Sequence, residues 1–580
     1  MKWVFKYLKP LRSRIAVGIT IKTIGTLAEL MIPFLLSHIL DNVITTNDPK
    51  NIVFYGILMA ICAIIACLGN IIANRMAAKT TMIFSTNMRR DLFSKTLHLS
   101  ARSTDRFTIP SLESRITSDT YNVQNFIGMM QRMGIRAPIL LLGGTTITML
   151  MDRKLALVMV ATLPIIFAVV YSISRLGVPL YSKVQQSVDG MVRVVREDAQ
   201  GIRVIKALSK VDYENARYDK ANMTLKRTET KAGVIMGIVN PIMTLLMNMG
   251  IVAVVAASAH FVSMGESSTA TVIAFMQYFT LISMAMMSLS RMFVSYTKCA
   301  ASANRISLVM NEESELKICE DDGKGDEKFH ISFENVSFSY LGKANNISNI
   351  SFSIKEGERL GIIGPTGSGK STILRLLMRF YDSNEGTVRI NGKDVRSYSP
   401  DELTSMFGVV FQNDFIYADT IEENIRFGRD ISNEDIIEAT KIAQAYDFIN
   451  SFSDGFEHKV STGGTNLSGG QRQRLLISRA IAGRPEILIL DDSSSALDYK
   501  TDANLRLALS KALPSSTVIT VAQRVSSVKS CDLILVIENG EIIGCGKHDE
   551  LMASCAEYKA ISDSQMGSVD EIEMGGELIG

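Results

Sequence analysis

Hydrophobic residues are arranged differently in the two halves of this chain. Before about residue 310 they form long, nearly continuous runs, each followed by a polar connection. After about residue 330 the apolar blocks are short and alternate with turns and helical patterns. Long runs predict helices that cross a bilayer, whereas short blocks between helices predict the buried strands of an α/β domain.

The first half contains six of these long runs. Each is near the roughly 20 residues that a helix needs to cross a bilayer, and several are longer. A soluble helical bundle is the alternative, but runs of this length and apolarity favour membrane spans. The predicted spans are residues 13–42, 52–78, 125–151, 154–180, 232–263 and 268–298.

The connections between the spans alternate in length. They are short after the first, third and fifth span, and long, charged and helical in pattern after the second and fourth. Basic residues are frequent in the long connections and near the N-terminus, where they are Lys2, Lys6, Lys9, Arg12 and Arg14. Because basic segments stay on the cytoplasmic side, we expect a multi-pass protein of the plasma membrane with both termini and the second half in the cytoplasm.

Several polar residues lie within predicted spans, among them Lys22 and Glu29 in the first and Arg132 and Arg136 in the third. Ionisable groups in a bilayer face the interior of the helix bundle or a water-filled cavity. These residues are therefore either part of a substrate pathway or partners in hydrogen bonds between helices.

The composition agrees with an apolar part joined to a polar one, because the mean hydropathy is +0.17 although 21% of the residues are charged. With 580 residues, the chain is too long for a single hydrophobic core. Its net charge of +2 gives no electrostatic argument for a nucleic-acid partner. The seven cysteines are scattered and form neither a metal-binding pair nor a disulfide framework.

A glycine-rich loop at residues 364–372 has the spacing G-x-x-x-x-G-K-S, and it lies between a strand-like run and a helical pattern. This order of elements is typical of phosphate-binding loops, in which backbone N–H groups turn toward the phosphates. Lys370 would reach the β- and γ-phosphates, and the Ser371 hydroxyl would bind Mg²⁺. The expected cofactors are ATP and Mg²⁺, and the expected contacts are Gly364, Thr366, Gly367, Ser368, Gly369, Lys370, Ser371 and Thr372.

Other candidate residues flank this loop. Tyr340 ends a strand-like segment and is a candidate for stacking on adenine, and Gln412 is a candidate for contacting Mg²⁺ or the attacking water. An apolar strand at 486–492 ends in Asp491 and Asp492, and Asp491 suits the Mg²⁺ shell. A second helix N-terminus able to hold an anion follows Leu467, Ser468, Gly469, Gly470 and Gln471.

Together these motifs resemble those of the ABC transporters, and the resemblance covers nearly the whole chain. The glycine loop occurs in many nucleotide hydrolases, but its combination with the L-S-G-G-Q signature and the acidic strand is specific. Six spans followed by one ATPase domain resemble an exporter-type half-transporter. The resemblance implies ATP-driven export of a hydrophobic or amphipathic substrate (a drug, lipid or peptide) by alternating access.

The resemblance also implies roles for single residues. Tyr340 would stack on adenine, and Gln412 would sense Mg²⁺ and couple the site to the membrane helices. The signature, residues 467–471, would contact ATP bound to the opposite subunit, and Asp498 would lie between the two sites. The implied coupling helices are residues 99–106 and 204–210.

The chain departs from the family pattern at two catalytic positions. The family places a glutamate after the Walker B aspartate and a histidine in the switch loop, where this chain has Asp492 and Gln523. The shorter carboxylate is withdrawn by roughly 1.5 Å, and a misplacement of that order can lower a rate by about 100-fold. A glutamine can donate to the γ-phosphate but cannot carry the charge of an imidazolium. With Gln412, these two residues are the candidate catalytic residues of a slow site.

The signature is intact, so the chain is equipped to complete the site of a partner. We therefore expect a heterodimer with a second half-transporter that carries the glutamate and the histidine. The alternatives are a homodimeric exporter with slow ATPase and an ATP-gated channel or regulator. A soluble ABC ATPase would lack the spans of the first half.

The predicted fold class is multidomain: an all-α transmembrane domain of six helices, followed by an α/β P-loop ABC ATPase domain with a helical subdomain. The transmembrane domain with its cytoplasmic helical extensions is assigned to residues 1–310, and the ATPase domain to 330–564. A polar, acidic linker is expected at 311–329, and a flexible acidic tail at 565–580.

Overall fold

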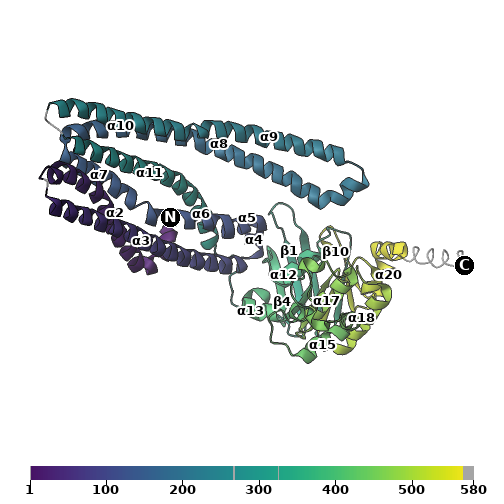
Figure 1. Ribbon diagram of the computed structural model, residues 1–580. Helices are drawn as coiled ribbons and strands as arrows, with labels where there is room; N and C mark the ends of the chain where they lie inside the picture. The colour runs from purple at the N-terminus through teal and green to yellow at the C-terminus, as the bar shows by residue number, and fades with distance from the viewer. Residues whose placement is uncertain (1, 47, 265–267, 324, 566–580) are drawn as a thin grey trace. The chain divides into compact units, whose positions relative to one another are not determined.

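The structure is a computed structural model that describes residues 2–46, 48–264, 268–323 and 325–565. It divides into two compact units (Figure 1). The helical unit contains Met1–Leu99 and Phe107–Glu312, and the α/β unit contains Ser100–Arg106 and Glu313–Gly580. Apart from Gln565, the predicted acidic tail lies outside the described residues.

The helical unit is built from long helices that begin at capped positions. The Asp48 side chain accepts a hydrogen bond from the N–H of Lys50, and Asp152 and Ser268 cap two later helices in the same way. The helices are α1 (Lys2–Leu8), α2 (Arg12–His38), α3 (Pro49–Leu97), α5 (Ile109–Ser114), α6 (Thr120–Arg132), α7 (Arg136–Met151), α8 (Arg153–Ala207), α9 (Val211–Gly237), α10 (Val239–Ser263) and α11 (Thr269–Met310). Helix α4 (Ala101–Phe107) belongs to the α/β unit except for its last residue.

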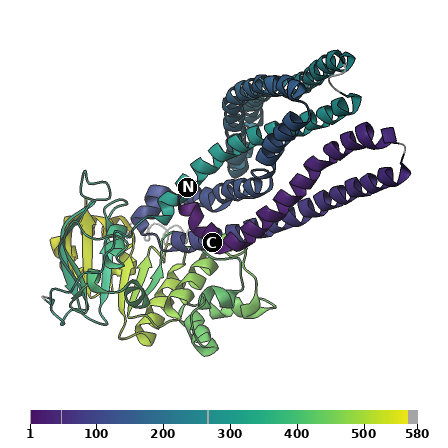
Figure 2. The same ribbon diagram turned by 90° about the vertical axis from the view of Figure 1, so that its left-hand side faces the viewer.

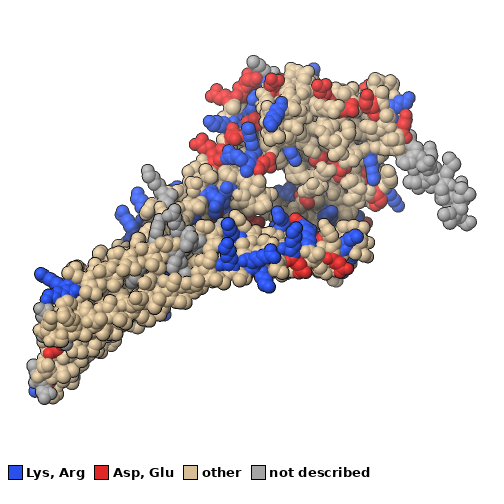
Figure 3. Space-filling view, turned by 90° about the horizontal axis from the view of Figure 1, so that it is seen from above, with Lys and Arg blue, Asp and Glu red and all other residues tan. Residues whose placement is uncertain are grey.

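Among the described residues, five helical stretches are long and apolar enough to cross a membrane. They overlap five of the predicted spans, while the predicted span 154–180 lies in α8, where several side chains are not described. On the face seen in Figure 3, a long part of the helical unit is almost free of charged side chains. The five stretches are Trp3–Val43, Pro49–Leu97, Ile109–Met151, Thr244–Phe261 and Thr269–Met310.

Two of the predicted spans are not single helices. The run 125–151 is interrupted between α6 and α7 at Gly134, where a Cβ atom would lie 2.6 Å from the carbonyl oxygen of Met130. The run 232–263 is interrupted at Ile238, between α9 and α10. Pro241 follows this break and cannot donate the backbone hydrogen bond that would continue α9. The apolar pattern predicted both spans but not these interruptions.

Helices α2 and α3 run side by side (Figure 2), and their backbones come close at two glycines. A Cβ on Gly69 would lie 3.1 Å from the Cα of Gly25. Nearby, the buried Lys22 ammonium donates to Asn70 Oδ1 at 2.7 Å and to Asn74 Oδ1 at 3.1 Å. Small residues and polar pairs are the usual means of joining helices in a bilayer.

Glu29 of α2 forms an ion pair with Arg136 of α7 at 2.6 Å. With the bonds of Lys22, this pair shows that Lys22, Glu29 and Arg136 contact side chains of neighbouring helices. The observed contacts therefore agree with the interpretation of hydrogen bonding between helices.

The α/β unit contains two sheets. A four-stranded antiparallel sheet has the order β2-β1-β4-β5, and a six-stranded sheet has the order β10-β9-β3-β8-β7-β6. Within the larger sheet, β9, β3, β8, β7 and β6 are parallel, and β10 is antiparallel at the edge. The strands are β1 (Ile331–Phe338), β2 (Ile347–Ile354), β3 (Arg359–Ile363), β4 (Glu385–Ile390), β5 (Lys393–Asp394), β6 (Phe407–Val410), β7 (Ile487–Asp491), β8 (Thr517–Val521), β9 (Leu533–Glu538) and β10 (Glu541–Gly546).

Several helices of this unit bury Ile425, Ile436 and Leu475 in a hydrophobic cluster that they share with strand residues such as Leu488. These helices lie between β6 and β7, within the predicted α/β domain, and their assignment as a separate subdomain stays a prediction. Apart from α4, the helices of the α/β unit are α12 (Lys370–Leu377), α13 (Pro400–Ser405), α14 (Ile421–Arg426), α15 (Asn433–Ile442), α16 (Tyr446–Asn450), α17 (Gly469–Ile481), α18 (Tyr499–Ala512), α19 (Val525–Val528) and α20 (His548–Ser554).

The acidic segment predicted as a linker is held against the α/β unit. The buried Arg389 guanidinium of β4 donates to both carboxylate oxygens of Asp322, at 2.7 and 2.9 Å. Arg379 also donates to the carbonyl oxygen of Lys317 at 2.5 Å. Such buried arginines need partners, so this segment supplies hydrogen-bond acceptors to buried charges of the α/β unit.

We expect Gly69→Ala to destabilise the helical unit, because the added methyl group meets the backbone of α2 and forces the two helices apart. Overpacking of this kind costs roughly 1–3 kcal/mol. Gly56→Ala is the matched control on the same helix, since nothing lies within 4 Å of its Cβ position. The midpoint of thermal unfolding in detergent should fall for the Gly69 variant only, and equal midpoints would contradict the close crossing.

Candidate nucleotide-binding site

The glycine loop connects the end of β3 to the start of α12, as the sequence predicts. Gly369 has φ 104° and would place a Cβ 2.7 Å from the Ile347 side chain, so only glycine fits there. At Gly367, with φ 84°, nothing lies within 4 Å of the Cβ position. The loop is thus tightly held on one side and open on the other, which leaves its backbone N–H groups accessible to a phosphate.

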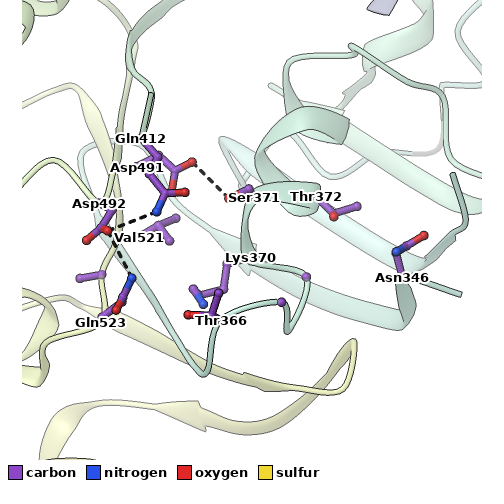
Figure 4. A pocket seen from close by; sticks show the side chains of 13 residues that line it. Asn346, Thr366, Lys370, Ser371, Thr372, Gln412, Asp491, Asp492, Val521 and Gln523 are labelled. Atoms are coloured by element: carbon purple, nitrogen blue, oxygen red, sulfur yellow. Dashed lines mark hydrogen bonds between the residues drawn. The ribbon is translucent and has the colours of Figure 1, made fainter. Parts of the chain in front are cut away.

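The open side of the loop borders a cavity of about 270 Å³. Most of the predicted phosphate contacts line it, together with both acidic residues that end β7 (Figure 4). The lining residues are Asn346, Thr366, Gly367, Gly369, Lys370, Ser371, Thr372, Gln412, Asp491, Asp492, Val521, Ala522 and Gln523.

The Lys370 side chain bonds to the backbone of the glycine loop. Its ammonium donates to the carbonyl oxygens of Gly364 and Pro365, at 2.9 and 2.7 Å. Burial lowers the pKa of Lys370, and the carboxylates of Asp491 and Asp492 oppose that shift. A phosphate would exchange with the two neutral carbonyls and offer the ammonium a charged partner, which gives a stronger hydrogen bond.

Ser371 and Asp491 form the pair expected to hold the metal. The Ser371 hydroxyl donates to Asp491 Oδ2 at 3.2 Å, and Asp491 is 7% exposed. Burial raises the pKa of Asp491, and the hydrogen bond from Ser371 only partly offsets it. The described residues contain no cluster of three or more His, Cys, Asp or Glu side chains that could hold a metal. One carboxylate and one hydroxyl fit Mg²⁺, which takes its other ligands from phosphates and water.

Asp492 is held by two side-chain amides. Gln412 Nε2 donates to Asp492 Oδ2 at 3.4 Å, and Gln523 Nε2 donates to the same oxygen at 3.3 Å (Figure 4). Both bonds are long and therefore weak. The backbone of Asp492 has φ 51°, a conformation that aspartate adopts more readily than most residues. All three predicted catalytic side chains thus meet at one oxygen.

Tyr340 lies beside the cavity but does not line it. Its hydroxyl donates to Thr372 Oγ1 at 3.4 Å and accepts a hydrogen bond from Arg375 at 3.0 Å. The Arg375 guanidinium also lies 5.8 Å from the centroid of the tyrosine ring. Adenine stacking by Tyr340 stays a prediction.

Gly364 and Ser368 likewise lie outside the set of lining residues. Gly364 allows the chain to pass the carbonyl oxygen of Ile537, which a Cβ would approach to 2.0 Å. The buried Ser368 hydroxyl has no hydrogen-bond partner among the described residues. An orphaned polar atom of this kind inside the loop fits a site that takes a polar ligand.

The signature, residues 467–471, lies at the start of α17 and is separate from this cavity. The Ser468 hydroxyl accepts from the N–H of Gln471 at 3.2 Å, and the Gln471 side chain accepts from the N–H of Ser468 at 2.9 Å. This reciprocal cap stabilises the helix N-terminus. Ser468 and Gly469 are exposed, so the N-terminus is open to a ligand on another molecule.

Asp498 lies close to the signature helix. A Cβ on Gly470 would lie 3.3 Å from the carbonyl oxygen of Ala496, two residues before Asp498. Asp498 caps α18 through hydrogen bonds from Thr501, which lower the pKa of its carboxyl. In the described chain it contacts neither the loop nor the β7 carboxylates, and its predicted place between two sites stays a prediction.

Sequence reasoning did not identify Asn346, which lines the cavity from the loop between β1 and β2. Its Oδ1 accepts from the N–H of Tyr340 at 3.1 Å. An asparagine in a short turn is common, so the sequence carries no signal for this position. Arg375 was also missed, although its place on α12, one turn after Ser371, is visible in the sequence.

Comparison with known families identifies both units. The family described as "ABC transporter transmembrane region" matches residues 15–286, and the family described as "ABC transporter" matches residues 347–495. Together these matches cover most of the helical unit and the cavity-lining residues from Thr366 to Asp492.

Two relatives are similar to this chain over nearly its whole length. The uncharacterized ABC transporter ATP-binding protein YfiB of Bacillus subtilis is 32% identical over 571 residues, covering 98% of this chain and 99% of YfiB. An uncharacterized ABC transporter ATP-binding protein of Mycobacterium tuberculosis is 31% identical over 573 residues, with 97% of each chain covered.

A solved structure described as a bacterial Atm1-family ABC exporter with ATP bound has the same fold. Its TM-score is 0.82 at 23% identity, covering 96% of this chain and 98% of that chain. At this identity the likeness shows the fold alone.

We expect Asp491→Asn to stabilise the chain at neutral pH in the absence of nucleotide. The pKa of Asp491 is raised by burial, so the folded state binds its proton more tightly than the unfolded state does. The ionised carboxylate therefore opposes folding, and the advantage of the variant should shrink as pH falls through the raised pKa. The variant should also lose the Mg²⁺-dependent part of the stabilisation by ATP.

The measurement is thermal unfolding of the full-length chain in detergent, with ATP and either Mg²⁺ or EDTA. Asp401→Asn, at an exposed carboxylate of α13, is the control and should behave like the native chain. A variant that still gains stability from Mg²⁺ with ATP would contradict the metal role of Asp491.

Proposed function

Because this chain belongs to the ABC transporter family and joins the membrane and ATP-binding regions of that family in one polypeptide, we propose that it is half of a heterodimeric exporter. It uses ATP to move a hydrophobic or amphipathic compound, such as a drug, lipid or peptide, across the plasma membrane by alternating access. Six spans would form its membrane part, with both termini and the α/β unit in the cytoplasm.

The observation that carries the heterodimer is the environment of Asp492. A general base must hold the attacking water in line with the γ-phosphate. Here the carboxylate is on a short side chain, and the Oδ2 atom that faces the cavity already accepts from Gln412 and Gln523. A water would compete with these amides for the same oxygen, so hydrolysis at this site is slow.

The second part of the argument is the missing imidazolium. Gln523 occupies the switch position and lines the cavity beside the glycine loop. Its amide can donate one hydrogen bond to a γ-phosphate, but it brings no positive charge to the transition state. The site would therefore hold Mg-ATP firmly while hydrolysing it slowly, with Ser371, Asp491 and Gln412 near the metal.

The signature supports a role at a second, faster site. Its helix start is capped within the chain, and Ser468 and Gly469 are exposed. An open helix N-terminus with two glycines suits the γ-phosphate of ATP bound to another subunit. The partner would supply the catalytic glutamate and histidine, and this chain would supply residues 467–471 to the partner's nucleotide.

Coupling to the membrane would involve the segment 99–106. Within the α/β unit, the Tyr381 hydroxyl donates to Asp105 at 2.5 Å, and Arg102 pairs with Glu315 at 3.0 Å. Burial and the hydrogen bond to Asp105 raise the pKa of Tyr381, so this phenol stays a donor at all physiological pH values. These bonds support the segment as the first coupling helix, and the turn between α8 and α9 would be the second.

A homodimeric exporter with slow ATPase uses the same residues, and an ATP-gated channel or regulator tolerates a slow site. Substrate-stimulated ATPase separates the exporters from the channel, whose hallmark is an ionic conductance without stimulated hydrolysis. Co-purification with a second half-transporter separates the two exporters.

We expect brisk Mg-ATPase activity only when this chain is purified together with a second half-transporter that has the glutamate and histidine. Replacing the catalytic glutamate of that partner by glutamine should abolish the activity, whereas Asp492→Asn in this chain should change it little. Brisk turnover by this chain alone, lost in Asp492→Asn, would overturn the heterodimer.

We further expect Asp492→Glu combined with Gln523→His to raise hydrolysis at this chain's own site by roughly 10- to 100-fold, since both missing groups are restored. The site is isolated by pairing the variant with a partner whose own P-loop lysine is replaced by alanine. Each single variant should give a smaller gain, and adding Lys370→Ala should return the rate to background. A double variant that binds ATP as tightly as before but is no faster would contradict the explanation.

A further inference from the structure

The last described helical segment, residues 556–565, packs near the ends of β3 and β8, beside the nucleotide site. Tyr558 is fully buried in a core that includes Ile363 at the end of β3 and Ala522 and Val525 after β8. Its hydroxyl also bonds to His548 Nδ1 at 2.9 Å. The segment is therefore anchored to the two strands that lead into the glycine loop and the switch loop.

The end of this segment contacts the backbone of the switch loop. The N–H of Val525 donates to Gln565 Oε1 at 2.9 Å, and Gln565 Nε2 donates to the carbonyl oxygen of Gln523 at 2.9 Å. One side-chain amide thus holds both ends of a three-residue stretch, and both distances are those of good hydrogen bonds. Gln523 is at one end of that stretch, and its own side chain donates to Asp492.

A second cavity, of about 450 Å³, joins these parts. Gly364, Pro365 and Thr366 of the glycine loop line it together with Gln523. Glu557, Ala560 and Ile561 of the C-terminal segment line its other side. The C-terminal segment is therefore next to both loops that border the nucleotide cavity.

We propose that Gln565 is a positioning residue of the nucleotide site. It holds the backbone of residues 523–525 so that the Gln523 side chain points to Asp492 and to the γ-phosphate of bound ATP. This inference rests on the proposed role of Gln523 as the γ-phosphate contact. It assigns to the C-terminal segment a direct influence on how the site distinguishes ATP from ADP.

The contact uses both ends of the glutamine amide. Its carbonyl oxygen accepts from one backbone group while its NH₂ group donates to another. A glutamate would keep the bond from Val525 but would place a negative oxygen beside the carbonyl of Gln523. A leucine of similar size would lose both bonds and leave the two backbone groups without these partners.

Hydrogen–deuterium exchange on the full-length chain in detergent tests the contact itself. In Gln565→Leu, we expect the Val525 amide to exchange about tenfold faster, the factor that corresponds to the loss of one amide hydrogen bond. Gln565→Glu keeps that bond and should exchange like the native chain. Ser564→Ala is the matched control, because its hydroxyl bonds only to Ile561 within the same segment among the contacts described.

Equilibrium binding of Mg-ATP and Mg-ADP to the same proteins tests the positioning. We expect Gln565→Leu and Gln565→Glu to weaken the binding of ATP about three- to tenfold, since one hydrogen bond to the γ-phosphate is misplaced. The affinity for ADP should be unchanged. In a Gln523→Ala background, the substitution at Gln565 should have no further effect on ATP, because no side chain remains to be positioned. Ser564→Ala should change neither nucleotide.

If the variants weakened the binding of ATP and ADP equally, Gln565 would have a merely structural role and the proposal would be overturned. The same holds if the effect on ATP binding persisted in the Gln523→Ala background. Unchanged exchange at Val525 in Gln565→Leu would overturn it as well. If Gln523→Ala alone leaves the ratio of ATP to ADP affinity unchanged, the proposed γ-phosphate role of Gln523 is wrong. The positioning role then falls with it, while the exchange data still report the contact separately.

Discussion

The parallel pairing of β3, β8, β7 and β6 is the constraint on which the nucleotide site depends. In a parallel sheet, the residues that follow each strand emerge at the same edge. The glycine loop follows β3, Gln523 follows β8, the two aspartates end β7, and Gln412 follows β6. The sheet therefore brings side chains from four distant parts of the sequence together in one cavity. A shift in the pairing of any one of these strands would remove a functional group from the site.

The same geometry places charged side chains at a partly buried edge of the sheet. Lys370 and Asp491 both have pKa values shifted by burial in the direction that disfavours their charged forms. Each is only partly compensated by its neighbours, the lysine by the two aspartates and Asp491 by Ser371. ATP with Mg²⁺ would bring a cation to the Asp491 carboxylate and an anion to the Lys370 ammonium. Binding would therefore stabilise the folded state.

The sequence predicted those parts of the structure that depend on local pattern. The strand, loop and helix around Lys370, the acidic strand before Asp492 and the long apolar runs all follow from the order of neighbouring residues. The breaks at Gly134 and Ile238 were not predicted, because a hydropathy pattern averages over single residues that interrupt a helix. The anchoring of the acidic segment by Arg389 and the contact of Gln565 with the switch loop depend on residues more than 40 positions apart. No periodicity or motif encodes such contacts. The substitutions at Asp492 and Gln523 are visible in the sequence, but only the structure shows that their side chains bond to each other.

That bond bears on how an asymmetric transporter would work. In a consensus site, a carboxylate that holds water and a cationic switch residue act separately on the nucleotide. In this chain the Gln523 side chain bonds to Asp492 directly, and Gln412 is a second donor to Asp492 Oδ2. In the proposed slow site, these amides would occupy the oxygen that an attacking water needs. The intact, capped signature helix on the same chain is not affected by this change, because it lies outside the cavity. The nucleotide cavity and the signature helix are therefore physically separate within one α/β unit. In the proposed heterodimer, hydrolysis could be slow at the cavity while the signature helix still serves a partner, without any further change in the fold.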